Sequence, residues 1–278
     1  MNVAAFIEDL NLGLEEQHRG DCPVCSGNNT FTVTRNRDGI LYNCYKADCN
    51  ISGKQSSQIR VSDLTAKAQV PTTPFVLPPH VLMGRPEITR WIETHEYPFE
   101  NVELYYDIKE ERIVFPVRHE GKIVDATGRS IKKAVVSISK TSYNWRNCQP
   151  KWKRYGSSSH AYTHGTGDVA VIVEDAISGA MVGATIATAT GVALMGTSLL
   201  SSHVEQLRAF EGVIIALDPD ALKKTLLFSQ ELRSKLDTNK IFAMKLEDDL
   251  KYRKNNDILK LKDKVWEFTE MYGGPAWR

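Results

Sequence analysis

The sequence predicts a protein of the α/β class, in which a small β domain precedes a larger domain built on a parallel sheet. Three observations lead to this prediction. Apolar runs alternate with helical patterns from residue 168 to residue 252, as in parallel sheets that helices cover on both faces. Acidic residues follow directly after several of these runs. Four of the five cysteines are packed between positions 22 and 49.

The cysteine cluster predicts a zinc site within residues 1–52. The segment DCPVCSGNNTFTVTRNRDGILYNCYKADCN holds two close pairs of cysteines, and a turn can aim each pair of thiolates at one tetrahedral ion. Clustered cysteines in a chain without a secretory signal indicate metal rather than disulfides. The expected zinc ligands are Cys22, Cys25, Cys44 and Cys49. Such a ribbon is either purely structural or also a surface for single-stranded nucleic acid, with these residues exposed on it: Phe31, Arg35, Arg37, Tyr45 and Lys46.

Shifts in composition divide the rest of the chain. Residues 53–79 are rich in Ser, Thr and Pro, which predicts a linker. Residues 80–167 contain a helical segment, RPEITRWIETHEYP, bounded by two prolines, and a hairpin, ERIVFPVRHEGKIVDATGRSI, with a polar turn at residues 119–121. The parallel sheet is expected in residues 168–252, and apolar residues at helical spacing predict a C-terminal helical tail in residues 253–278.

A net charge of only +1 conceals a strongly basic segment. No Asp or Glu occurs between residues 126 and 167. Charge of one sign concentrated in this way predicts a phosphate-binding face. The basic residues of the segment are Arg129, Lys132, Lys133, Lys140, Arg146, Lys151, Lys153 and Arg154.

The carboxylates that follow the apolar runs predict a divalent-metal site. In GVIIALDPDALKK, Asp218 and Asp220 end a predicted strand, and strand positions two apart share a face. Ligands of parallel sheets gather at the carboxyl ends of the strands. The alternative is an acidic turn with a helix N-cap. The carboxylates at the other strand ends are Glu174, Asp175, Glu247, Asp248 and Asp249.

The sequence also predicts a cytoplasmic protein that does not interact with membranes. No apolar run approaches the length needed to cross a bilayer. The first residues, MNVAAFIEDLNLGLEEQHRG, lack a basic region followed by an apolar core.

Taken together, the motifs resemble those of bacterial and phage DNA primases. A strand ending in Glu, a later strand ending in Asp-x-Asp and a further acidic strand end resemble the TOPRIM arrangement. RIVFPVRHEGKIVDATGRSI resembles the primase core motif, which ends in a functional arginine, and QPKWKRYGSSS resembles the basic motif. VALMGTSLLSSHVEQL resembles the stretch between the two acidic motifs. With the zinc ribbon in front, the order of parts is similar over most of residues 20–250.

This resemblance implies a zinc ribbon, which selects the template start site, linked to a primase RNA-polymerase core with a TOPRIM subdomain. It implies template-directed synthesis of short RNA primers on single-stranded DNA with Mg²⁺ or Mn²⁺. The implied catalytic residues are Glu174, Asp218, Asp220 and Arg129. The implied magnesium ligands are Glu174, Asp218, Asp220 and Asp249. The implied nucleotide-binding and DNA-binding residues are Lys132, Lys151, Lys153 and Arg154.

The expected partners are the DNA template and ribonucleoside triphosphates. A replicative helicase and a DNA polymerase are expected as separate proteins, because the sequence has no Gly-x4-Gly-Lys-Ser/Thr loop. The small size is typical of a phage-encoded enzyme, which would act in the host cytoplasm.

The chain departs from the family pattern at Ser178, where a second carboxylate is expected, and at Leu222 and Lys223, where small residues are expected. Two alternatives therefore stand beside the primase. One is a metal-dependent TOPRIM nuclease, and the other is a non-catalytic zinc-ribbon module that binds single-stranded DNA.

Overall fold

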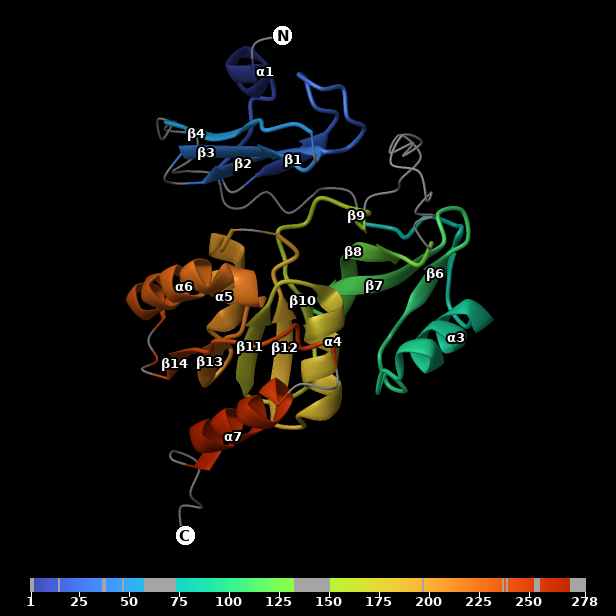
Figure 1. Ribbon diagram of the computed structural model, residues 1–278, viewed down its shortest axis with the longest axis vertical. Helices are drawn as coiled ribbons and strands as arrows, with labels where there is room; N and C mark the ends of the chain where they lie inside the picture. Colours follow the sequence, from blue (N-terminus) through green and yellow to red (C-terminus); the bar gives the residue numbers. More distant parts are fainter. Residues whose placement is uncertain are drawn as a thin grey trace. The chain divides into compact units, whose positions relative to one another are not determined.

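The computed structural model describes residues 3–14, 16–36, 39–46, 48–57, 74–132, 151–196, 198–236, 238, 240–252 and 256–270. The chain forms two compact units (Figure 1). Unit 1 comprises Met1–Pro74 with Ser157–Ser159, and unit 2 comprises Phe75–Gly156 with His160–Arg278. Among the residues that the structure describes, every helix is too short or too polar to cross a lipid bilayer.

Unit 1 is a four-stranded antiparallel sheet with one short helix. Its sheet has the order β1-β2-β3-β4. The central strands β2 and β3 pair from Phe31↔Cys44 to Asn36↔Gly39. Ile7 of the helix and Phe31 and Val33 of β2 form a small core with the cysteines. The elements are α1 (Val3–Asp9), β1 (Gln17–Gly20), β2 (Phe31–Asn36), β3 (Gly39–Cys44) and β4 (Ser52–Gln55).

The first part of unit 2 is an antiparallel sheet with the order β5-β6-β7-β8-β9. The predicted hairpin is β7 and β8, whose turn places Glu120 and Gly121 at φ 48° and 76°, as a two-residue hairpin turn requires. The predicted helix α3 begins at Pro86 and ends before Glu96, which adopts the left-handed conformation. The elements are β5 (Val81–Leu82), α3 (Pro86–His95), β6 (Tyr105–Asp107), β7 (Arg112–His119), β8 (Lys122–Ser130) and β9 (Trp152–Arg154).

The second part of unit 2 is a five-stranded sheet with the order β10-β12-β11-β13-β14. Strands β12, β11, β13 and β14 are parallel, which confirms the α/β class, while β10 is an antiparallel edge strand that the sequence analysis did not predict. The elements are β10 (Tyr162–His164), β11 (Val169–Val173), α4 (Ala176–Thr185), β12 (Ala189–Ala193), α5 (Ser201–Leu207), β13 (Gly212–Ile215), a 3₁₀ turn (Pro219–Ala221), α6 (Leu222–Lys235), β14 (Ile241–Ala243) and α7 (Asp257–Glu270).

Helices cover both faces of this second sheet, as predicted (Figure 1). Val171 of β11 belongs to a core with α4 and α7, whereas its neighbour Ile172 belongs to a core with α5 and α6, because successive strand residues point to opposite faces. The first core also contains Trp91 of α3 and Phe115 of β7. The two sheets of unit 2 therefore share one apolar core, and this core positions the strand ends described next.

Candidate functional site

The four cysteine thiols of unit 1 converge as the sequence predicts. Their Sγ atoms all lie within 4.8 Å of one another. The Sγ of Cys22 is 3.9 Å from that of Cys49, and the Sγ of Cys25 is 3.7 Å from that of Cys44. Zinc–sulfur bonds of about 2.3 Å in a tetrahedron place the sulfurs roughly 3.8 Å apart. The arrangement therefore fits a four-coordinate zinc ion.

The surroundings of Cys44 favour the thiolate that such an ion needs. Burial raises the pKa of Cys44, but hydrogen bonding with the Thr30 hydroxyl and the backbone of Lys46 outweighs it and lowers the pKa to about 7. The Oγ1 of Thr30 lies 3.4 Å from the Sγ of Cys44. Thiolates are the ligand form of cysteine, so these contacts assist metal binding.

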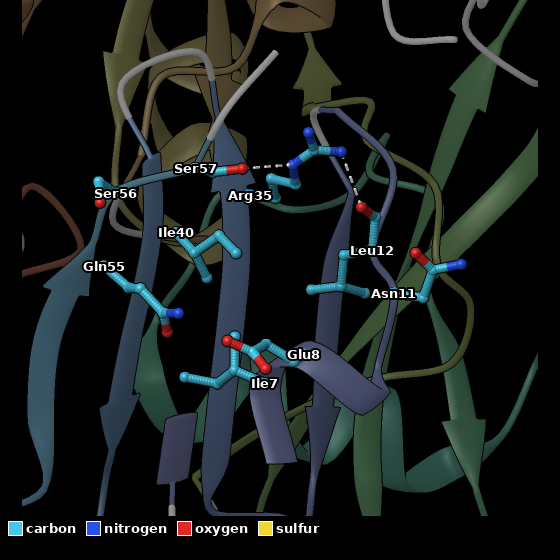
Figure 2. A pocket seen from close by; sticks show the side chains of 9 residues that line it. All are labelled: Ile7, Glu8, Asn11, Leu12, Arg35, Ile40, Gln55, Ser56 and Ser57. Carbon is cyan, nitrogen blue, oxygen red and sulfur yellow. Dashed lines mark hydrogen bonds between the residues drawn. The ribbon is translucent and has the colours of Figure 1, made fainter. Parts of the chain in front are cut away.

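A hollow of ≈ 290 Å³ lies beside Arg35 on the same unit (Figure 2). Arg35 is only 2% exposed. Its Nε donates to the Oγ of Ser57 at 3.0 Å, and its Nη1 donates to the carbonyl of Leu12 at 2.9 Å. The side chain thus joins β2 to the segments that follow α1 and β4. The remaining lining residues are Ile7, Glu8, Asn11, Ile40, Gln55 and Ser56.

The prediction that the ribbon exposes a nucleic-acid surface made of its basic and aromatic residues is partly wrong. Arg35 is buried, and Phe31 is 0% exposed because it forms the core of the sheet. Tyr45 is exposed as predicted, Lys46 is half-buried, and Arg37 lies outside the described residues. Sequence spacing did not reveal that the face carrying Phe31 packs against α1.

In unit 2, the predicted carboxylates lie at one edge of the parallel sheet. Ile172 of β11 pairs with Ile215 of β13 in parallel register, so the two strands end together. Glu174 follows the end of β11, Asp218 lies three residues after the end of β13, and Asp249 follows β14. The order β11-β13-β14 makes these three strands consecutive in the sheet.

The predicted reason for pairing Asp218 with Asp220 is wrong, because both lie beyond the strand. Strand β13 ends at Ile215, and Asp218 precedes a 3₁₀ turn that contains Asp220. Pro219 stands between them, and it has no N–H group to donate to a sheet ladder. Asp218 is half-buried, and Asp220 is exposed.

The carboxylates repel one another, which shows that they lie near each other. Burial, the negative charge of Asp249 and then that of Glu174 raise the pKa of Asp218 to about 7. Burial likewise raises the pKa of Glu174; the positive charge of Lys224 opposes this, and the charge of Asp220 adds to it. Within the described residues, only the four cysteines bring three or more metal-ligating atoms together within 4.8 Å. The carboxylate oxygens of the acidic edge therefore lie farther apart than the cysteine thiols do.

Lys251 is a charged member of this edge that sequence reasoning missed. Its side chain is buried, and its Nζ lies 3.1 Å from Oδ2 of Asp175 and forms a second ion pair with Oδ2 of Asp249. The other oxygen of Asp175, Oδ1, accepts a hydrogen bond from the N–H of Ser178 at 2.9 Å and so caps α4. Asp249, the fourth predicted magnesium ligand, is thus already bound to a cation.

Two of the predicted cations face the acidic edge. Burial lowers the pKa of Arg129, and the nearby charge of Asp175 opposes this shift. Burial and then the charge of Arg129 lower the pKa of Lys151, while Asp175 and Asp249 act in the opposite direction. The guanidinium of Arg129 lies 5.5 Å from the ring centroid of Trp152. Its Nη1 is buried and has no hydrogen-bond partner within the part of the chain that the structure describes.

The other predicted cations differ in their surroundings. Lys153 forms an ion pair with Glu110. The Nη2 of Arg154 lies 2.5 Å from Oδ2 of Asp125, a carboxylate that is fully buried. Lys132 is exposed. Of the remaining basic segment, Lys133, Lys140 and Arg146 lie outside the described residues.

No family model matches the chain, and no curated protein matches it. Solved structures with a similar fold include bacterial and phage primase domains. The catalytic domain of a DnaG primase bound to single-stranded DNA has 18% identity over 69% of this chain, with a TM-score of 0.42. This alignment spans 64% of that structure, just under two thirds of its length.

Two further structures include more of the chain. The zinc-binding and RNA polymerase domains of the Aquifex aeolicus primase have 13% identity over 94% of this chain and 82% of that structure, with a TM-score of 0.48. The primase fragment of the bacteriophage T7 primase-helicase protein has 14% identity over 91% of this chain and 99% of that structure, with a TM-score of 0.44. At these identities and TM-scores, the function has to be argued from the side chains of this chain.

Proposed function

We propose that the chain is a DNA primase that synthesises short RNA primers on single-stranded DNA from ribonucleoside triphosphates. The observation that carries the proposal is that an acidic strand edge lies near a half-buried arginine, Arg129, whose buried Nη1 has no hydrogen-bond partner among the described residues. Glu174 and Asp218 lie at the ends of neighbouring parallel strands, and the buried Nη1 of Arg129 lacks an acceptor within the described residues. A buried donor without a partner costs about 1–3 kcal/mol, and a phosphate oxygen would satisfy it.

The acidic residues hold the divalent ion in this proposal. Glu174, Asp218 and Asp220 offer carboxylate oxygens, which Mg²⁺ and Mn²⁺ prefer. When bound, the ion neutralises charge on the phosphates during attack by the 3′-hydroxyl of one ribonucleotide on the α-phosphate of the next, as pyrophosphate leaves. Asp249 contributes negative charge to the edge while it is paired with Lys251.

The basic residues bind the anionic substrates. Arg129 and Lys151 are within electrostatic reach of the edge, so they contact the triphosphate. Lys132 is exposed and contacts the template backbone. Lys153 and Arg154 are already paired with carboxylates. They can bind phosphate only by giving up these partners, so their proposed contribution is smaller.

Unit 1 reads the template start site in this proposal, with zinc holding its two cysteine turns. A TOPRIM subdomain is proposed for the parallel sheet and its acidic edge. A separate helicase would open the duplex, and a separate DNA polymerase would extend the primer. The same proposal includes that the protein is encoded by a phage and acts in the cytoplasm of the host cell.

Primer synthesis tests the proposal directly. The protein is incubated with single-stranded DNA of varied sequence, labelled ribonucleotides and Mg²⁺ or Mn²⁺, and the products are separated by length. We expect short RNA from the wild type and none from Asp218→Ala. The matched control is Asp263→Ala, which removes an exposed carboxylate of α7 and should retain synthesis.

The same assay separates the alternatives. DNA cleavage without RNA synthesis would establish a nuclease instead. Tight DNA binding with neither activity would establish a non-catalytic binding module. Equal RNA synthesis by the wild type and Asp218→Ala would show that Asp218 of the acidic edge is not needed for the reaction.

A further inference from the structure

A buried lysine lies among the carboxylates of the acidic edge. Lys251 is 5% exposed. Its Nζ is shared between Asp175, at the start of α4, and Asp249, in the segment after β14. These two carboxylates are 74 residues apart in the sequence, so the tertiary fold alone brings them to one ammonium group.

The ammonium group of Lys251 contacts two of these carboxylates at once. Its Nζ lies 3.1 Å from Oδ2 of Asp175 and forms a second ion pair with Oδ2 of Asp249. Its charge also acts on Asp218. One positive charge is therefore within electrostatic reach of three carboxylates of the edge.

The need to hold the segment after β14 in place does not explain why position 251 carries a charged residue. The carboxylate of Asp257 already accepts hydrogen bonds from the N–H groups of Glu247 and Asp248, at 2.7 and 3.0 Å. Leu250 is 1% exposed and packs in the main core. Apolar side chains in place of all three members of a buried charged triad would hold the segment about as well, so anchoring alone does not require the charges of Lys251, Asp175 and Asp249.

We propose that Lys251 is a built-in cation of the acidic edge: it occupies the position between Asp175 and Asp249 and leaves one divalent-ion site, formed by Glu174, Asp218 and Asp220. This inference rests on the proposed divalent-ion role of the edge. A second divalent ion is excluded because one oxygen of Asp175 and one oxygen of Asp249 are already bound to the ammonium group of Lys251, whose charge would repel the ion. Lys251 is accordingly a positioning residue, which sets how many metal ions the edge accepts.

Counting bound Mn²⁺ ions tests this inference without any activity measurement. The zinc-loaded protein is titrated with Mn²⁺, and free Mn²⁺ is measured by electron paramagnetic resonance. We expect Lys251→Gln to bind one more Mn²⁺ than the wild type, and Lys251→Gln/Asp249→Asn to return to the wild-type number. Lys251→Arg, which keeps the charge, should also bind the wild-type number.

The matched control is Lys235→Gln, which removes the same charge from an ion pair with Glu231. Lys235 is the last residue of the 14-residue helix α6, about 20 Å along the helix from its start near Asp218. The control should bind the wild-type number of ions. A folded Lys251→Gln variant with an unchanged Mn²⁺ count would overturn the inference.

A second measurement applies even if Lys251→Gln does not fold. In the wild-type background, Asp249→Asn should leave the Mn²⁺ count unchanged, whereas Asp218→Asn should lower it by one. Loss of one ion in Asp249→Asn would show that Asp249 binds metal despite Lys251, and the inference would fail. A protein that makes no primers yet gives the expected counts would contradict the proposed function and leave the metal stoichiometry standing.

Discussion

Replacing Asp218 by Asn should stabilise the metal-free protein at pH 8 even though it removes a proposed metal ligand. Asn has nearly the same shape and carries no charge. Burial and the neighbouring carboxylates raise the pKa of Asp218 to about 7, from about 3.9 for an unperturbed aspartate. The folded state therefore holds this proton more tightly than the unfolded state does. The stability of the metal-free wild type falls as the pH rises from about 4 to about 7.

The size of the effect follows from this shift. Three pKa units at about 1.4 kcal/mol each set a ceiling of about 4 kcal/mol. Asp218 is only half-buried, so water and salt screen much of the repulsion, and about 1–2 kcal/mol is the expected gain. For a unit of this size, each kcal/mol raises Tm by about 2–4 °C. Asp218→Asn should thus melt about 2–8 °C above the wild type at pH 8.

Thermal unfolding measured by circular dichroism tests this expectation. Melts are recorded from pH 5 to pH 8 in buffer freed of divalent ions but without a strong chelator, so that the cysteine site keeps its zinc. The difference between the two proteins should shrink toward pH 5, and added Mg²⁺ should stabilise the wild type but not the variant. Asp263→Asn, an exposed carboxylate of α7, serves as the control. A variant that melts at or below the wild type at pH 8 would refute the reasoning.

Three further predictions concern the zinc unit and the basic face. Arg35→Met should lower the free energy of unfolding of unit 1 by about 2–3 kcal/mol, because the Leu12 carbonyl and Ser57 lose a buried donor. Urea unfolding, monitored by zinc release, measures this loss. The exposed residue Arg19 provides the control Arg19→Met, and an equal loss in both variants would contradict the prediction. Cys44→Ser should lose zinc and impair initiation on a DNA template more than extension of a supplied primer; equal loss in both assays would contradict start-site selection by unit 1. Affinity for single-stranded DNA should fall about 20-fold between 50 and 200 mM salt if about three cations contact phosphates, as expected of Arg129, Lys132 and Lys151. Fluorescence anisotropy measures this affinity, and an affinity that does not change with salt would show that these residues do not contact the DNA backbone.

The cysteine cluster and the strand ends were predictable because their signals are local. Two turns with close cysteine pairs need only short-range geometry to aim their thiols at one ion, and the Sγ atoms do converge. The carboxylates after β11 and β13 lie at the same edge of the sheet because these parallel strands end together. The hairpin turn at Glu120 and Gly121 is likewise set by neighbouring residues.

Burial and ion pairing, in contrast, were decided by the tertiary structure. Nothing near Arg35 in the sequence indicates that its guanidinium joins Leu12 to Ser57 instead of facing solvent. The antiparallel pairing of β10 with β12 also depends on the packing of a whole sheet.

The sequence by itself thus determined the fold class, the thiol ligands and the acidic character of one sheet edge, since periodicity and spacing act over a few residues. Only the tertiary structure decided that Lys251 lies against Asp175, a residue 76 positions away. The charge that a carboxylate presents to a ligand depends on every neighbour in space, and those neighbours come from distant parts of the chain.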